Sequence, residues 1–248
     1  KSNIENSLYE LFYAGEESEE TEEKSELEDN VDKAEDEEDE KNEESKVQVD
    51  PIEIDVAEYI TNTKSGVDLI PSESALSGLE VELVELDSLD RTRQLKNILE
   101  YIEDDSYDYI LIDCPPSLGL LSINALVASD SIIIPIQTEY YALEGVSELM
   151  NTFNLVKEGL NPDLEIEGVL LSMFDKRTLL SYEVVEEVKS YFKTDVFKVM
   201  IPRNPRLAEA PSHGLSTIEY DHKSPGAIAY ANLANVIISK ESEGKDVQ

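Results

Sequence analysis

The stretch that most constrains this chain runs from Tyr107 to Gly119, with the sequence YDYILIDCPPSLG. Residues 109–112 form a short apolar run that ends in Asp113 and is then stopped by Pro115 and Pro116. A short run of this kind favours a buried parallel strand over a helix. We therefore expect Asp113 at the carboxyl end of a central strand, where open α/β sheets bind their ligands. The plain alternative is that Asp113 only ends the strand and caps the next helix.

Predicted strands and helices alternate along the rest of the chain. Short apolar runs predict strands at residues 67–70, 109–112, 131–136, 166–173 and 196–201. Apolar residues at helical spacing predict helices at residues 89–102, 118–128, 141–158, 179–192 and 224–239, and a helix over 51–62 is possible. This alternation is typical of an α/β fold with a doubly wound, mostly parallel sheet flanked by helices. Residues 109–112 and 132–135 are the expected core strands.

The formal net charge of −36 is spread unevenly along the chain. Residues 1–65 hold 24 acidic and 6 basic residues, a net charge of −18. Residues 171–206 instead hold 7 basic and 5 acidic residues, a net charge of +2. A chain this acidic repels nucleic acid on average, so any surface for an anionic ligand is expected within residues 171–206.

The segment Glu16–Lys46 is a low-complexity acidic tract with 18 acidic and 4 basic residues. It holds too few apolar residues to offset the conformational entropy lost on folding, so we expect it to be disordered. Elsewhere, the single cysteine, Cys114, excludes an internal disulfide and fits a reducing cytosol. No apolar run approaches the length that a membrane-spanning helix needs, so no membrane partner is expected.

Several unlike motifs recur in one order over roughly residues 66–238. They are residues 113–119 (DCPPSLG), 122–126 (SINAL), 128–131 (ASDS), 139–145 (EYYALEG), 201–204 (IPRN) and 208–214 (AEAPSHG). In this order they resemble the ParA/Soj ATPases, which partition chromosomes and plasmids and belong to the MinD/ParA group of P-loop NTPases.

The resemblance implies a nucleotide site near the central stretch. Asp113 would be the catalytic, Walker B-like acid, which orders Mg²⁺ indirectly, through its water, near the γ-phosphate of ATP. Pro115, Pro116 and Gly119 would belong to the second switch loop, which senses that phosphate. ATP and Mg²⁺ are therefore the expected cofactors.

The resemblance assigns further roles to four residues near the carboxyl terminus. Pro202 and Arg203 would line the adenine pocket at the sheet edge, although an ordinary turn would have the same sequence. Arg177 and Arg206 would contact the DNA backbone, because guanidinium forks suit phosphate oxygens. The alternative for these two arginines is a pair of solvated surface charges.

The expected partners also come from the resemblance. They are a second copy of the chain on ATP binding, non-specific double-stranded DNA, and a ParB-type centromere-binding protein that stimulates hydrolysis. The implied location is the cytoplasm, in association with the nucleoid. MinD-type membrane binding is not expected, because the residues after Ile238 are polar and form no basic amphipathic helix. One cysteine is too few for the iron–sulfur cluster of other relatives.

One family feature, the deviant Walker A loop KGGVGKT, does not occur, and Gly159 and Gly168 are the two glycines nearest in sequence. We therefore expect an N-terminally truncated ATPase that does not hydrolyse ATP as these 248 residues alone. The alternative is a P-loop-less paralogue that acts as a non-catalytic interaction or DNA-scaffold module. The expected segments are an N-terminal ATPase remnant (1–13), the acidic insertion (14–47), the ParA-like ATPase domain (48–240) and a polar tail (241–248).

Overall fold

The computed structural model describes residues 6–13, 55–103, 105–141 and 144–245. These residues form two units, which we treat separately. Unit 1 contains the described residues up to Cys114 together with Gly119–Asn124, and unit 2 contains Pro115–Leu118 and the described residues from Ala125 onward. The expected acidic insertion at 14–47 lies outside the described residues, and the division into four segments stays a prediction.

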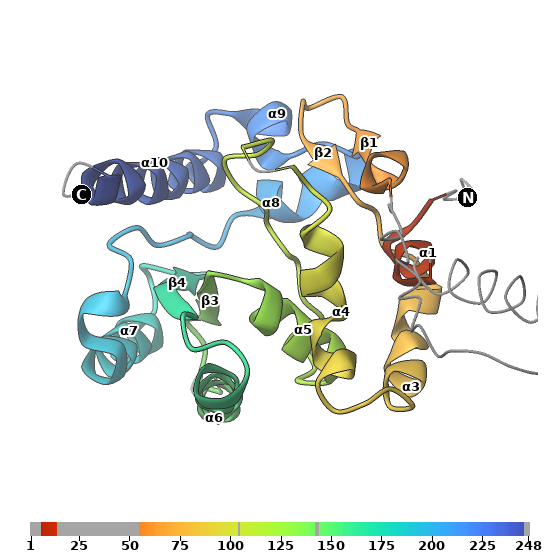
Figure 1. The fold of residues 1–248 in the computed structure, drawn as a ribbon. Helices are drawn as coiled ribbons and strands as arrows, with labels where there is room; N and C mark the ends of the chain where they lie inside the picture. The colour runs from red at the N-terminus through yellow and green to blue at the C-terminus, as the bar shows by residue number, and fades with distance from the viewer. Residues whose placement is uncertain (1–5, 14–54, 104, 142–143, 246–248) are drawn as a thin grey trace, which may run out of the picture. The chain divides into compact units, whose positions relative to one another are not determined.

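Unit 1 is built from short elements (Figure 1). They are α1 (Leu8–Tyr13), the 3-10 turns η1 (Val56–Tyr59) and η2 (Ser74–Ser77), the strands β1 (Thr61–Asn62) and β2 (Asp68–Leu69), and the helices α3 (Leu79–Leu83) and α4 (Asp90–Leu99). β1 and β2 pair antiparallel around a turn in which Gly66 has a φ of 81°, a conformation that favours glycine. The strand expected at 67–70 is therefore present in shorter form. The possible helix over 51–62 is wrong for its described part, which forms η1 and β1.

The segment 109–112, expected as a buried central strand, is not a strand in this structure. Ile110 is 50% exposed and Leu111 is 86% exposed. A run of β-branched and apolar residues forms a strand only where neighbouring chain pairs with its N–H and C=O groups. Within the described part of unit 1, no segment pairs with these residues as a strand. The apolar pattern is thus present without its ladder, and the prediction of a buried strand is wrong here.

Unit 2 contains the parallel sheet. β3 (Ser131–Gln137) and β4 (Glu165–Ser172) pair in parallel, and helix α6 (Glu144–Gly159) forms the crossover between them. The core strand expected at 132–135 is confirmed as part of β3. The parallel pair and its helices confirm the α/β class.

A third segment of unit 2, residues 196–202, runs parallel to β4 but touches it at separate points. The N–H of Phe197 donates to the carbonyl of Val169 at 2.9 Å, and the N–H of Ile201 donates to Leu171 at 2.8 Å. Between these two hydrogen bonds the segment advances four positions, from 197 to 201, whereas β4 advances only two, from 169 to 171. Residues 198–200 therefore bulge away from β4. The continuous strand expected at 196–201 is wrong for that reason.

Helices cover both faces of this sheet (Figure 1). On one face, α6 and α7 (Leu179–Phe192) bury a cluster that consists of Ile134, Ile136, Val146, Val169, Leu171, Val184, Val185, Val188 and Phe192. On the other face, α10 (Pro225–Lys245) contributes Ala229 and Leu233 to a second cluster with Leu170, Phe197 and Ile201. Successive residues of β4 therefore point to opposite helical layers, as the pleat requires.

A β-bulge interrupts the pairing of β3 with β4. Ile132 pairs with Ile166 and Ile133 pairs with Gly168, so Glu167 is the extra residue. The Nζ of Lys240 in α10 donates to the backbone oxygen of Glu167 at 2.7 Å and to its carboxylate at 3.0 Å. A bulge leaves backbone groups without ladder partners, and Lys240 stabilises this one by supplying a donor.

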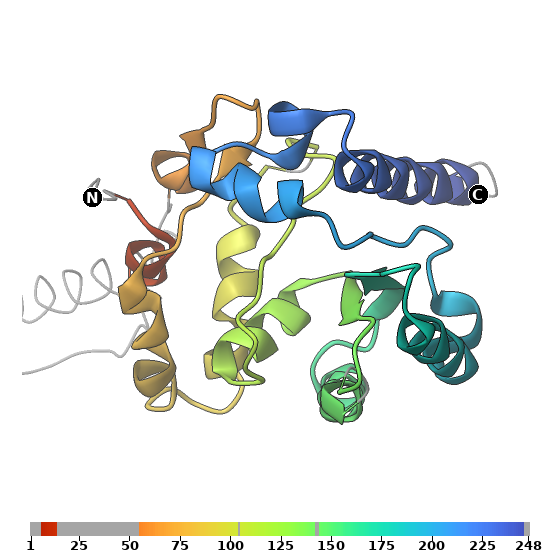
Figure 2. The same ribbon diagram turned by 180° about the vertical axis from the view of Figure 1, so that it is seen from behind.

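The remaining elements of unit 2 lead to and from the sheet. They are η3 (Lys193–Asp195), α8 (Pro205–Glu209), η4 (Ala210–His213) and α9 (Thr217–Asp221), and Figure 2 shows the extended path from α7 to α8. Helix α5 (Leu120–Ala128) crosses the division between the units, and in unit 2 the amide of Asn161 donates to three carbonyls at its end. The helix expected at 179–192 is confirmed, and those at 89–102, 118–128, 141–158 and 224–239 are confirmed with shifted ends. Among the described helices, none has both the length and the apolarity that crossing a membrane requires.

Candidate functional site

The carboxyl edge of the sheet in unit 2 gathers residues from three segments. Beyond the end of β3, the N–H of Thr138 donates to the carbonyl of Ser172 at 2.9 Å. Beyond the end of β4, the N–H of Phe174 donates to the carbonyl of Ile201, and the N–H of Arg203 donates back to Phe174, both at 3.0 Å. The three connections that leave this edge are thus tied together by backbone hydrogen bonds, at the place where open α/β sheets bind ligands.

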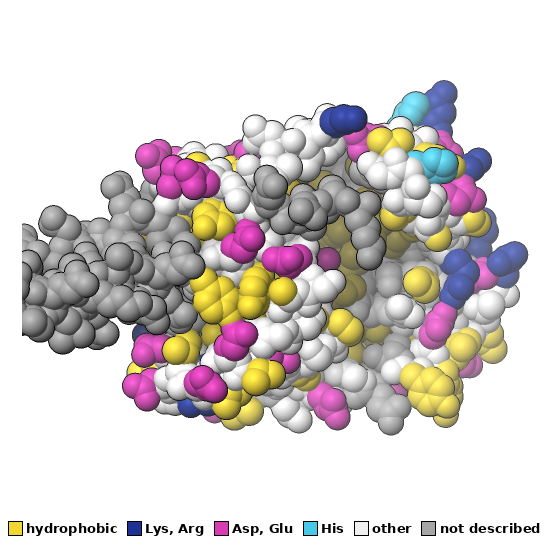
Figure 3. Space-filling model, turned by 90° about the vertical axis from the view of Figure 1, so that its right-hand side faces the viewer, with side chains coloured by type: hydrophobic (Ala, Val, Ile, Leu, Met, Phe, Trp, Pro, Cys, Tyr) yellow, Lys and Arg dark blue, Asp and Glu magenta, His cyan; other side chains and the backbone are white. Residues whose placement is uncertain are grey.

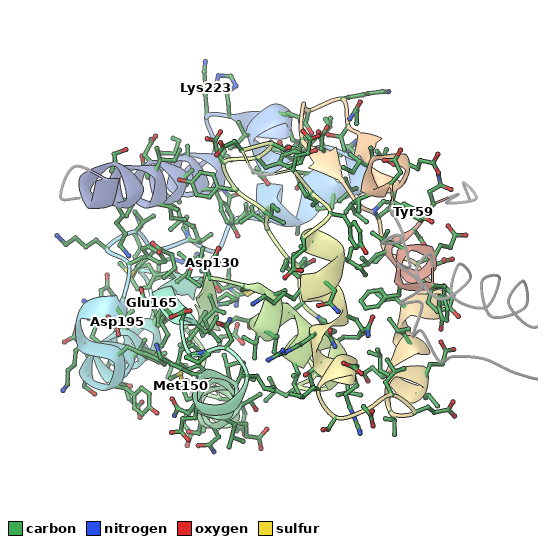
Figure 4. All side chains as sticks on the ribbon, in the orientation of Figure 1. Tyr59, Asp130, Met150, Glu165, Asp195 and Lys223 are labelled. Atoms are coloured by element: carbon green, nitrogen blue, oxygen red, sulfur yellow. The ribbon has the colours of Figure 1, made fainter. Side chains whose placement is uncertain are left out.

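The opposite, amino edge carries carboxylates. Asp130 and Glu165 lie at the starts of β3 and β4, where the N–H of Glu165 donates to the carbonyl of Asp130 at 2.9 Å, and Asp195 ends η3 beside β4 (Figure 4). Acidic side chains are also spread over the face drawn in Figure 3 rather than gathered in one patch. At the carboxyl edge, by contrast, the acids Asp175 and Glu139 each pair with an arginine, which makes this edge the better place for an anionic ligand.

Pro202 and Arg203 lie at the carboxyl edge, as the sequence predicted. Pro202 forms a parallel bridge with Phe174. The guanidinium of Arg203 forms an ion pair with the carboxylate of Glu139, which follows β3, and the two side chains are 54% and 52% exposed. Arg203 is therefore a surface side chain whose guanidinium is held at this edge by its ion pair with Glu139.

Arg177 lies on the loop that follows β4, next to a carboxylate from its own loop. Its Nε donates to Asp175 Oδ1 at 2.9 Å, and its terminal nitrogen donates to Oδ2 at 2.7 Å. The backbone N–H of Arg177 also donates to Oδ1 at 3.0 Å. These hydrogen bonds keep the pKa of the Asp175 carboxyl well below its usual range and raise the pKa of Arg177.

Arg206 lies on α8, which Asn204 caps by accepting the N–H of Arg206 at 3.0 Å. Its guanidinium is 2.6 Å from Glu209 and 3.5 Å from Asp221, and it lies over the ring of Tyr220 at 5.8 Å. The hydrogen bond to Glu209 is the main reason that the pKa of Arg206 is raised. Arg206 thus has carboxylates on its edges and an aromatic ring below its plane.

Asp113 and the loop after it are exposed. Asp113 belongs to unit 1 and directly follows the largely exposed apolar segment 109–112. Pro115 and Pro116 are also exposed. Gly119 is half-buried, and a Cβ at that position would overlap the carboxylate of Glu80, which accepts the N–H of Leu121 at 3.3 Å. Gly119 therefore allows Glu80 to approach the first turn of α5.

The carboxylates of the described residues fit a magnesium ion that arrives with a phosphate. No group of three or more His, Cys, Asp or Glu side chains with metal-binding geometry occurs in the described ranges. Mg²⁺ usually keeps several waters and binds through one or two carboxylates plus substrate phosphates. A single exposed acid such as Asp113 suits that role, whereas a metal cage made by the protein alone does not fit.

Sequence reasoning found the arginines of this edge but missed the acids that pair with them. Asp175 was detectable, because an aspartate side chain often accepts the backbone N–H two positions later, and Glu209 was detectable, because three positions separate it from Arg206. Glu139 gave no such signal, since 64 positions separate it from Arg203. Arg203 and Glu139 are brought together only because the segments that precede them lie on either side of β4 in the folded sheet.

Comparison with known proteins adds to this geometry. Residues 1–166 match the model of a family described as an AAA domain. Over 186 residues the chain is 54% identical to the sporulation initiation inhibitor protein Soj of Bacillus subtilis, which covers 75% of this chain and 72% of Soj. It is 52% identical to the chromosome partitioning protein ParA of Myxococcus xanthus over 70% of this chain and 60% of that protein.

Among solved structures, one similar protein is a cobyrinic acid a,c-diamide synthase of Mycobacterium smegmatis, with bound ADP and magnesium. The TM-score is 0.65 at 31% identity, over 77% of this chain and 69% of that one. The identity to the partitioning proteins is higher, and it spans most of the described residues. The chain therefore belongs to the Soj/ParA family of chromosome-partitioning ATPases.

Proposed function

We propose that this protein is a ParA-type ATPase of DNA segregation. In this proposal, ATP binding drives dimerisation, the dimer binds DNA without sequence preference, and a ParB-type partner stimulates hydrolysis and release. The protein would act in the cytoplasm on the nucleoid. The observation that carries the proposal is the exposed Arg177, on the same sheet edge as Pro202 and Arg203. This edge lies at the carboxyl ends of parallel strands, where α/β proteins bind nucleotides, and Arg177 supplies N–H donors that suit a phosphate.

The nucleotide chemistry proposed for the family member uses the residues named from the sequence. Asp113 would orient the water shell of Mg²⁺, and Pro115, Pro116 and Gly119 would respond to the γ-phosphate. Attack of water in line with the bond to that phosphate is the proposed step. ADP and magnesium bound to the similar synthase structure support nucleotide binding at this fold.

DNA binding in a chain with a net charge of −36 must come from a local surface. The basic residues that we propose for this surface are Lys176, Arg177, Lys198, Arg203 and Arg206, all within residues 171–206, where the net charge is +2. Dimerisation would double this group on one particle, which explains why we expect retention only with ATP. The acids that pair with the arginines are solvent-exposed or half-buried, so phosphates can compete for the outer guanidinium edges.

The experiment that tests this proposal is DNA retention by the protein as its whole gene encodes it, with ATP and Mg²⁺. Arg177→Glu combined with Arg206→Glu should abolish retention at moderate salt and leave nucleotide binding intact. The matched control is Arg93→Glu with Lys96→Glu, two exposed residues of α4 with the same change of charge. If both double variants reduce retention equally, the effect is one of net charge and the assignment of Arg177 and Arg206 is wrong.

The catalytic part of the proposal has its own test. Asp113→Ala in the same protein should abolish ATP hydrolysis, measured as release of phosphate. Asp108→Ala, an exposed acid five positions earlier in the chain, is the control and should keep the rate. DNA retention by a protein that never hydrolyses ATP would instead favour a non-catalytic DNA scaffold.

A further inference from the structure

Hydrogen bonds from Thr178 and Ser181 hold the base of the loop that carries Arg177. The hydroxyl of Thr178 donates to the carbonyl of Asp175 at 3.1 Å, and the N–H of Thr178 donates to the same oxygen at the same distance. The buried hydroxyl of Ser181 lies 2.9 Å from that of Thr178 and 3.4 Å from that of Thr138. The chain after β4 is therefore tied to α7 and to the residue after β3, which leaves Asp175 on a rigid base.

Asp175 and Arg177 differ sharply in their exposure to solvent. The side chain of Asp175 is 18% exposed, whereas that of Arg177 is 80% exposed. Asp175 contacts the guanidinium through Nε and one terminal nitrogen, which form one edge of the planar group. The N–H groups of the far edge are not used by this pair. An anion that approaches from solvent thus meets the guanidinium before it meets the carboxylate.

We infer that Asp175 is a positioning residue for the binding of DNA phosphates: it fixes Arg177 with the free edge of its guanidinium facing outward. The inference rests on the proposed function, because it concerns the same DNA-binding surface. A long arginine side chain loses rotamer entropy when it binds a phosphate. A fork that is already formed removes part of that loss before DNA arrives, which is the general benefit of preorganisation.

The alternative effect of Asp175 has the opposite sign. A carboxylate next to Arg177 lowers the local positive charge, so its removal should strengthen binding if charge alone mattered. The Asp175→Ala variant therefore separates the two effects by the direction of the change. Glu183→Ala, at an exposed position of α7, makes the same change of charge without touching Arg177 and is the matched control.

The test measures binding of a linear DNA duplex by the protein as its whole gene encodes it, with ATP and Mg²⁺, over a series of salt concentrations. We expect Asp175→Ala to weaken binding about two- to fivefold, the range that an exposed ion pair commonly contributes. The slope of log affinity against log salt should fall by up to about 0.9, the value for one lost phosphate contact. Asp175→Asn, which keeps an oxygen acceptor, should show an intermediate loss. Glu183→Ala should bind equally or slightly more tightly.

A cycle with Arg177→Ala completes the test. Once Arg177 is absent, removal of Asp175 should cause no further loss, because its effect passes through the guanidinium. The inference is overturned if Asp175→Ala and Asp175→Asn bind as tightly as Glu183→Ala while Arg177→Ala binds weakly; the proposed DNA surface would then survive. If Arg177→Ala leaves affinity and salt slope unchanged, the DNA assignment of Arg177 fails, and this inference fails with it.

Discussion

Among single residues, Gly168 combines a close packing contact with a central place in the sheet. A Cβ built on it would overlap the ring of Phe197, which is 6% exposed and packs with Leu170 and Ile201. We expect Gly168→Ala to lower the free energy of unfolding by about 1–3 kcal/mol, the usual effect of overpacking a core. Urea unfolding followed by circular dichroism measures this change. Gly159→Ala, whose added Cβ would meet no neighbouring atom within 4 Å, is the control and should be neutral or slightly stabilising. Equal losses in both variants would contradict the packing argument.

The positions of residues were predictable from the sequence where they depend on near neighbours. The place of Pro202 and Arg203 at the sheet edge follows from the strand-like segment that precedes them. The partner of Arg203 did not follow, because Glu139 approaches it only once β3, β4 and residues 196–202 are aligned. Local spacing thus predicts which residues reach an edge, and the fold decides which of them pair.

At the level of elements, α9 shows how a short helix depends on its first turn. Ser216 Oγ accepts the N–H of Glu219 at 3.2 Å, and the Glu219 carboxylate accepts the N–H and hydroxyl of Ser216 at 3.0 and 2.8 Å. The hydrogen bond from the Ser216 backbone is the main reason that the pKa of Glu219 is lowered. Since the folded pKa lies below the unfolded value, this stabilisation is present above about pH 4.3 and is lost as the pH falls through the folded pKa.

The measurement for α9 is a titration of the Glu219 carboxyl by NMR. Glu219 should titrate below the ordinary range of glutamates, and Ser216→Ala should raise its pKa part of the way back, because the backbone donor remains. Ser239→Ala, which removes a hydroxyl that bonds within α10, is the control and should leave the Glu219 titration unchanged. An unchanged Glu219 titration in Ser216→Ala would show that the hydroxyl does not contribute.

Elements were predictable where amphipathic spacing is long, as the agreement at α7 shows. They were not predictable at residues 109–112, where the apolar run is typical of a strand but the described part of unit 1 supplies no partner. A strand depends on its neighbours for every backbone hydrogen bond, whereas a helix satisfies most of its own. This difference explains why the strands expected at 109–112 and 196–201 were wrong, whereas those expected at 131–136 and 166–173, which pair with each other, were placed to within one residue.

For the molecule as a whole, the main expectation concerns charge. Removal of residues 16–46 takes away 18 acidic and 4 basic residues, a net charge of −14 out of −36. We expect this deletion to strengthen DNA retention modestly at low salt and little at high salt, where the Debye length is about 3 Å near 1 M. A neutral Gly/Ser replacement of the same length controls for the loss of chain. An equal gain at low and high salt would show that the tract acts by another route than its charge.

Glu167, the extra residue of β4, gives this strand one residue more than its pairing with β3 needs. Ile166 packs on the same core cluster as Val169 and Leu171. In a regular strand it would point to the opposite face from both of them, because an odd number of positions separates it from each. The extra residue Glu167 brings Ile166 back to their face. A single deletion of Glu167 would leave Ile166 and Val169 on one side of an unbroken strand. Deletion of one residue usually moves the side chains on one side of the deletion to the opposite face of the sheet. Deletion of Glu167 would instead leave the same side chains in the core. Strands of two different lengths can thus serve the same sheet, so this site can absorb a change of length during evolution.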